Sequence, residues 1–147
     1  MNAKTLLGLL TIGLLPALFA GDSPSKPGVI HISHQTVDAA FEKGGPLIAT
    51  NNFKVQAGRR TAPGEVEIHD RDMDIFHILE GSATFVTGGK VVGAKSSGPG
   101  ETRGKEIQGG TEQHLVKGDI IIIPNGVPHW FKAVDGTFLY YVVKVAQ

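Results

Sequence analysis

One histidine in the C-terminal half of the chain follows a tight turn and is placed to do chemistry. Residues 120–123 are four isoleucines, a β-branched run typical of a strand buried on both faces. Residues 124–126, Pro-Asn-Gly, end that strand, because proline lacks an N–H for the sheet and Asn-Gly tolerates positive φ. The chain then presents His129 beside the apolar Trp130 and Phe131. An imidazole placed in this way could bind a metal ion or a substrate.

A second group of potential ligands lies earlier in the chain. Glu67 and His69 are two residues apart on an expected short strand, so both point to the same face of it. A charged turn follows, and Asp74 opens the next expected strand, residues 74–79. The alternation of this strand sends His77 to the face opposite Asp74, which favours a packing or interface role for this histidine.

The spacing around His129 resembles the second sequence motif of the cupin superfamily. Gly118, Pro124, Gly126 and His129 follow one another at the intervals of that motif without a gap. The motif usually closes with asparagine, and Ala133 stands at that position here. The resemblance extends from residue 53 to the C-terminus.

The earlier group resembles the first cupin motif, which is His-x-His, four residues, Glu, six residues and Gly. Glu67 takes the place of the first histidine, His69 is the second, Asp74 replaces the glutamate and Gly81 is the closing glycine. Thr61 stands where a leading glycine is usual. The resemblance implies a small barrel of antiparallel strands, usually dimeric, with a metal ion held inside by residues at these four positions.

The substitutions keep a potential metal ligand at every position of the implied site. Two imidazoles and two carboxylates suit a divalent ion such as Mn, Fe, Ni or Zn, and the residues alone do not select among them. Asp74 is one methylene shorter than the usual glutamate and could reach the ion through water. His69, His129 and one carboxylate would resemble the facial triad of non-haem iron sites.

A metal-free cupin is the alternative interpretation of the same residues. In that case Glu67 pairs with Arg59 or Arg60, and the histidines are satisfied by hydrogen bonds in the core. The candidate catalytic residues are Glu67, as a base, and Tyr140, as a proton donor. Arg103 is a candidate for holding an anionic group.

The elements expected around these residues are mostly strands. Twenty Gly and eight Pro among 147 residues suit many short strands and tight turns. The expected fold is all-β: a small antiparallel double-stranded β-helix (cupin or jelly-roll barrel) with a short N-terminal helix. Ser33 caps that helix, which runs through residues 37–41 and is closed by Gly44 and Gly45. The further expected strands are 29–32, 53–57, 66–69, 74–79, 83–87, 90–92, 120–123 and 137–145.

Two connections complete this expected arrangement. Glu80 and Gly81 are predicted to end the strand 74–79 in a hairpin turn. Residues 93–110, rich in Gly, Ser and Thr, are predicted to form a long loop that contains at most one strand.

The first twenty residues are predicted to be a secretory signal. Lys4 provides a positive start, residues 6–15 are apolar, and residues 17–20 (Ala-Leu-Phe-Ala) give an exit of small residues. The alternative is an uncleaved anchor. The predicted organisation is a signal at 1–20, an arm with the short helix at 21–50 and a cupin barrel at 51–147. The protein is then periplasmic or secreted, and without cysteine it has no disulfides.

Charge and motifs limit the possible partners. Lys and Arg together number 14, as do Asp and Glu, so no net charge favours nucleic acid, or a membrane once the signal is cleaved. The leading hypothesis is an exported metal-dependent enzyme of dioxygenase, isomerase or lyase type that acts on a small molecule. The alternatives are a non-catalytic module that binds a small ligand or metal, and a structural export protein. A homodimer is expected in each case.

Overall fold

The computed structural model describes residues 28–147, so the predicted signal at 1–20 lies outside the described residues. Within this range, no helix is long and apolar enough to cross a membrane. The elements are α1 (His34–Lys43), β1 (Gly45–Ala49), β2 (Phe53–Arg60), β3 (Val66–His69), β4 (Asp72–Thr87), β5 (Lys90–Val92), β6 (Lys95–Gly98), β7 (Glu101–Gly104), β8 (Glu106–Gln108), β9 (Thr111–Val116), β10 (Ile120–Ile123) and β11 (His129–Ala146).

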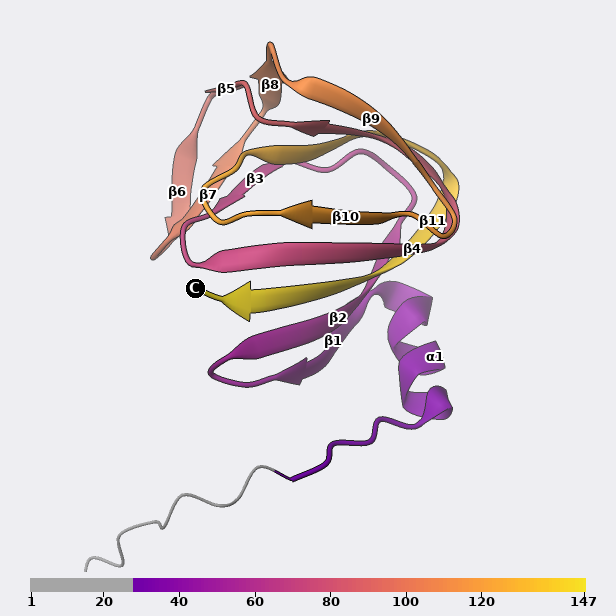
Figure 1. The fold of residues 1–147 in the computed structure, drawn as a ribbon. Coiled ribbons are helices and arrows are strands. Elements are labelled where there is room, and N and C mark those ends of the chain that lie inside the picture. The colour runs from indigo at the N-terminus through magenta and orange to yellow at the C-terminus, as the bar shows by residue number, and fades with distance from the viewer. Residues whose placement is uncertain (1–27) are drawn as a thin grey trace, which may run out of the picture. The chain divides into compact units, whose positions relative to one another are not determined.

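Two long strands, β4 and β11, organise the fold (Figure 1). They pair with each other along most of their length. The first half of β4 also pairs with β10, and its second half pairs with β9. The C-terminal part of β11 pairs with β2, and its first residue pairs with β3. All of these pairings are antiparallel, which confirms the expected all-β jelly-roll fold with one short helix.

Gly81 lies where β4 bends, and there the predicted hairpin is wrong. The strand continues from residue 72 to residue 87 without a break. Gly81 has a φ of 76°, a left-handed conformation that costs glycine little. A Cβ at this position would overlap the carbonyl oxygen of Thr137 on β11. Glycine is therefore required by both the backbone conformation and the close approach of β11.

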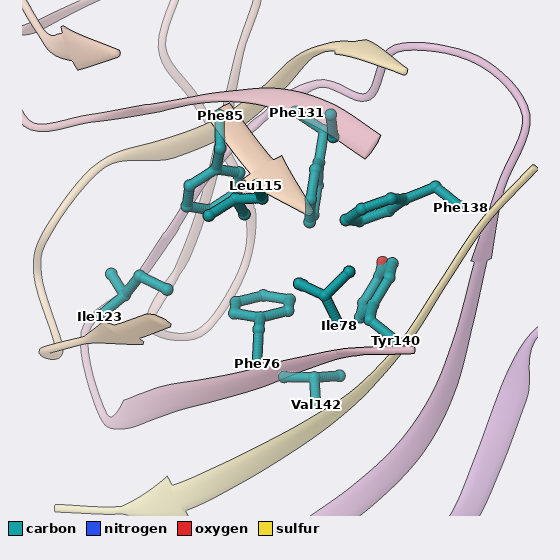
Figure 2. Close-up of a cluster of buried hydrophobic side chains, with 10 residues drawn as sticks. Phe76, Ile78, Phe85, Leu115, Ile123, Phe131, Phe138, Tyr140 and Val142 are labelled. Carbon is teal, nitrogen blue, oxygen red and sulfur yellow. The ribbon is translucent and has the colours of Figure 1, made fainter. Parts of the chain in front are cut away.

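The core is rich in aromatic rings (Figure 2), and its side chains come from β4, β9, β10 and β11. Phe85 and Phe138 are fully buried. The ring centroids of Phe85 and Phe131 are 4.6 Å apart, and those of Phe76 and Phe85 are 5.8 Å apart in an edge-to-face arrangement. Such pairs add about 0.5–1.5 kcal/mol each beyond the burial of their area. One end of this core continues into the imidazole of His129, whose centroid is 6.0 Å from that of Phe85.

The N-terminal helix forms where the sequence predicts it. The Ser33 hydroxyl accepts a hydrogen bond from the backbone N–H of Thr36, which caps the first turn. Gly44, with a φ of 76°, ends the helix. Phe41 packs edge-on against Tyr141 of β11, with ring centroids 5.1 Å apart. The helix therefore lies against the outer face of the sheet, away from the core.

Three other expectations about the elements are wrong. Residues 29–32 form no strand, whereas residues 45–49 form β1, which pairs with β2. Residues 93–110 contain β6, β7 and β8 instead of one long loop. The isoleucines 120–123 are not buried on both faces, because Ile120 and Ile122 are 65% and 57% exposed. This strand has one buried face only, so its apolar run was misinterpreted.

Replacing Gly58 with alanine is expected to lower the free energy of unfolding by about 1–3 kcal/mol, the usual cost of overpacking. A Cβ at this position would overlap the ring of Tyr140, which lies across from Gly58 on β11. Urea denaturation measures the change. Gly98→Ala is the matched control, because a Cβ there meets no atom within 4 Å. Equal stability of the two variants would contradict the prediction.

Candidate metal centre

Three potential ligands meet at the end of the aromatic core. Glu67 and His69 come from β3, and His129 is the first residue of β11, directly opposite Glu67 in the sheet. One ligand atom from each of these three side chains lies within 4.8 Å of the others. Both histidines are buried, with 3% of their surface exposed. The three residues are therefore positioned to bind one metal ion.

His129 presents a nitrogen that has no partner in the described part of the chain. Its Nδ1 lies 3.1 Å from the carbonyl oxygen of Val127, so we assign the proton of the neutral ring to Nδ1. Nε2 then carries a lone pair, and this atom is buried without a hydrogen bond. Burial lowers the pKa of His129, although the Val127 carbonyl and Asp74 oppose the shift. A neutral imidazole with an unused Nε2 is the form that binds a metal ion.

His69 is oriented by a carboxylate that the sequence did not reveal. Its Nδ1 lies 2.7 Å from a carboxylate oxygen of Glu101, which is opposite His69 in the β3–β7 pairing. Arg103 donates to the same oxygen at 3.2 Å. A carboxylate behind a ligand histidine fixes the ring and directs Nε2 toward the metal. Because residues 93–110 were expected to form a loop, neither the strand β7 nor this contact was predicted.

Glu67 lies between two guanidinium groups. Its carboxylate oxygens are 3.5 Å from Arg60 and 3.7 Å from Arg103, and 3.3 Å from Nε2 of His69. Burial opposes ionisation of Glu67, but the hydrogen bond with His69 and the charge of Arg103 outweigh it and lower its pKa to about 2. Glu67 is therefore an anion at neutral pH, which suits either a metal ligand or the partner of Arg60 that the metal-free interpretation predicts.

Asp74, the fourth expected ligand, has a lysine as its nearest partner. The ammonium of Lys144 lies 2.8 Å and 2.6 Å from the two carboxylate oxygens of Asp74. The Oδ2 atom of Asp74 is also 3.4 Å from Nε2 of His69 and 3.6 Å from Nε2 of His129. Asp74 thus reaches both imidazoles but is held by Lys144. Its role as a ligand stays a prediction.

His69 has an environment that favours its charged form. Burial resists that form, but Glu67, Asp74 and Glu101 outweigh burial and raise the pKa of His69, against the opposing charge of Lys144. The Lys144 ammonium lies 2.8 Å from Nε2 of His69. A hydrogen bond at that distance requires a lone pair on Nε2, so protonation of Nε2 and the contact with Lys144 exclude each other.

A cavity of about 100 Å³ opens beside these residues, and it is lined by Glu67, Asp74, His129, Tyr140 and Lys144 among others. The hydroxyl oxygen of Tyr140 accepts a hydrogen bond from Nε of Arg60 at 3.1 Å. Burial raises the pKa of Tyr140, against the opposing charge of Arg60. The hydroxyl therefore keeps its proton at neutral pH. Its role as a proton donor stays a prediction.

The donor set suits a divalent metal ion. Nε2 of the neutral His129, Nε2 of His69 once it has given up its proton, and one or two carboxylates match sites for Mn, Fe, Ni or Zn. The unpaired Nε2 of His129 is the observation that most favours such an ion, since an orphaned buried nitrogen is costly. Of the other histidines, His77 is exposed on β4 and points away from the site, as expected. Lys144 and Glu101 were not among the candidate residues expected from the sequence.

Protonation of Glu67 is expected to destabilise the metal-free protein at acid pH. As the pH falls from 4.5 to 2, the free energy of unfolding should decrease by about 3 kcal/mol at most. The folded pKa of about 2 lies below the ordinary 4.5. The ionised carboxylate therefore stabilises the fold above pH 4.5, and this stability is lost as the pH falls through 2. Denaturation in urea across this range measures it, and Glu67→Gln is the control. The prediction is wrong if both proteins lose the same stability.

The chain is similar to one protein family and to several solved structures. A family model described as "Cupin" matches residues 53–147. No curated protein matches the chain. Among solved structures, one from Bacillus halodurans is 14% identical, with a TM-score of 0.57 and 86% of each chain covered. A cupin protein from Bacteroides fragilis is 16% identical, with a TM-score of 0.51 and 83% of each chain covered.

The cupin domain of Cnp3 from Schizosaccharomyces pombe is 15% identical to the chain, with a TM-score of 0.52. The likeness covers 71% of this chain and 60% of that domain's chain, so the chain matches less than two thirds of this neighbour's length. At these identities the similarities to solved structures show the fold alone.

Proposed function

The chain belongs to the cupin family, and from this we propose that it is a metal-dependent cupin enzyme that acts on a small molecule. The observation that carries the proposal is the buried, unpartnered Nε2 of His129. It lies in a group with His69 and Glu67 whose ligand atoms are within 4.8 Å of one another. Cupins often hold a divalent ion with such residues, and the identity of the ion here is left to experiment.

The chemistry of the proposed enzyme is divided between the ion and the surrounding side chains. A bound divalent ion would polarise an oxygen of the substrate. We expect the Tyr140 hydroxyl to donate a proton to the substrate, because it lines the cavity and its oxygen is held by Arg60 at 3.1 Å. Glu67 serves as a metal ligand in this proposal and is a base only if it leaves the ion.

The cavity limits what the proposed enzyme accepts. A space of about 100 Å³ has room for a small molecule beside the ligands. The guanidinium of Arg60 lies 4.6 Å from the centre of the Phe131 ring at this cavity, and it pairs with Glu67. A small polar substrate with an oxygen for the ion fits this lining best. A non-catalytic metal or ligand module would use the same groups without turnover.

Metal content is the experiment that tests the proposal. The purified protein is analysed by plasma mass spectrometry beside Glu67→Ala, His69→Ala, Asp74→Ala and His129→Ala. Near-stoichiometric metal that is lost in both histidine variants would support the site. Protein that stays metal-free after incubation with Mn²⁺, Fe²⁺, Ni²⁺ and Zn²⁺, and folds equally in all four variants, would overturn it. Conversion of a small-molecule substrate that stops on chelation then separates an enzyme from a binding module.

Export and dimerisation belong to the proposal as well. The predicted signal at 1–20 supports a periplasmic or secreted location, and N-terminal sequencing of protein recovered from the periplasm or medium tests it: an intact Met1 would contradict cleavage.

The exposed Ile120 and Ile122 on β10 support a homodimer, since a second copy would cover them. Light scattering of wild type and Ile120→Glu tests this: a monomeric wild type would contradict the dimer.

A further inference from the structure

A lysine side chain reaches into the candidate metal centre from the end of β11. Lys144 is directly opposite Asp74 in the β4–β11 pairing, so both side chains point to the same face of the sheet. Only 13% of the Lys144 side chain is exposed. Its ammonium lies within 2.8 Å of three acceptor atoms, which are the two oxygens of Asp74 and Nε2 of His69.

The contact with His69 involves the atom that a metal ion needs. Nδ1 of His69 is bonded to Glu101, which leaves Nε2 as the only ring nitrogen available as a ligand. The ammonium has three N–H donors, and all three have an acceptor here. When His69 is neutral, Lys144 therefore satisfies one of the two imidazoles and one of the two carboxylates of the candidate site. His129 is the imidazole that remains without a partner.

We propose that the ammonium of Lys144 is an internal cation that competes with the metal ion for His69 and Asp74, and so sets the metal affinity of the site. The inference rests on the proposed function, because it concerns the same centre. A divalent ion bound to Nε2 of His69 cannot share that lone pair with an N–H donor. Binding of the ion therefore requires the ammonium to withdraw, which its flexible four-carbon stem permits.

Charge adds to this competition. An ammonium and a divalent ion in one largely buried site repel each other strongly, because little water screens them. Once the ammonium withdraws, Asp74 becomes available as a fourth ligand, directly or through water. Lys144 thus holds Asp74 and His69 in place before metal arrives and weakens the binding of the metal that follows.

Calorimetric titration with ZnCl₂ and MnCl₂ of wild type, Lys144→Leu and Lys54→Leu tests the proposal. Leucine provides no ligand atom. Lys54 is the matched control: it lies next to Lys144 across the β2–β11 pairing but bonds Asp72 at 2.8 Å, outside the site. We expect Lys144→Leu to bind the ions at least tenfold more tightly than wild type, and Lys54→Leu to bind them as wild type does.

The outcomes separate this proposal from the function proposed above. If wild type and Lys144→Leu bind the ions equally, the competition is overturned while the metal centre stands. If only Lys144→Leu binds, the competition is supported and the wild-type metal centre is not. If neither binds, both proposals fail.

Lys144→Leu leaves Asp74 as a buried carboxylate without its partner, and the variant could fail to fold. In that case Asp74→Asn is compared with Asp74→Asn/Lys144→Leu, in which neither charge is left behind. Tighter binding by the double variant supports the proposal. Equal binding by the two overturns it.

Discussion

His129→Ala is expected to weaken metal binding by more than about 100-fold. Loss of a residue that only hydrogen-bonds a metal ligand typically costs about 10–100-fold in affinity, and loss of the ligand itself should cost more. The reason is the position of Nε2, which is buried, points to the site and has no partner in the described residues. Removing the imidazole leaves one nitrogen ligand, and that one is engaged by Lys144. Calorimetric titration with ZnCl₂ measures the loss.

His77→Ala is the matched control for this prediction. It removes the same side chain from the exposed face of β4 and should leave the metal affinity unchanged. Circular dichroism of both variants checks that the fold is intact. A His129→Ala variant that is folded and binds Zn²⁺ as tightly as His77→Ala would show that this imidazole is not a ligand.

The sequence predicts the ligand positions better than the contacts around them. Glu67 and His69 share a strand face by simple alternation, and the motif spacing adds His129. Lys144 could have been found from the same alternation, because it continues the inward-facing row of Tyr140 and Val142 by one more step. The sequence analysis gives 137–145 only as an expected strand and assigns no role to a charged residue at its inward position.

Glu101 could not have been found in this way. Its contact with His69 depends on the pairing of β3 with β7, two short strands separated by 32 residues. β7 has the sequence Glu-Thr-Arg-Gly, which carries no apolar alternation. Glycine and polar residues in a strand look like a loop when only local pattern is considered. The long-range pairing overrides that local signal.

The bend at Gly81 illustrates a related limit of local pattern. Glu-Gly between two β-prone runs is typical of a hairpin, and two strands were predicted. In the structure the strand continues and its neighbours change, from β10 before the bend to β9 after it. At this point Gly81 has a positive φ, and β11 shifts its register opposite it, between Asp135 and Leu139. Nothing in the local sequence of β4 distinguishes this bend from a turn.

Phe85→Ala is expected to lower the free energy of unfolding by about 3–5 kcal/mol. Phe85 is fully buried and packs against Phe131 and Phe76, with centroid distances of 4.6 Å and 5.8 Å. A domain of this size has a stability of about 5–15 kcal/mol, so the change removes a large part of it. Urea denaturation of the metal-free protein measures the loss.

Phe53→Ala provides the control, because the same atoms are removed from a side chain that is 36% exposed at the start of β2. Equal losses in the two variants would contradict the assignment of Phe85 to the centre of the core. Metal binding provides a second measurement, which separates a specific role of Phe85 in supporting the site from a general loss of stability. Phe85 also supports the ring of His129, at a centroid distance of 6.0 Å. Phe85→Ala should therefore weaken Zn²⁺ binding under conditions where it is still folded. Phe53→Ala should not, because Phe53 is partly exposed at the start of β2 and is not among the residues that line the cavity at the ligands.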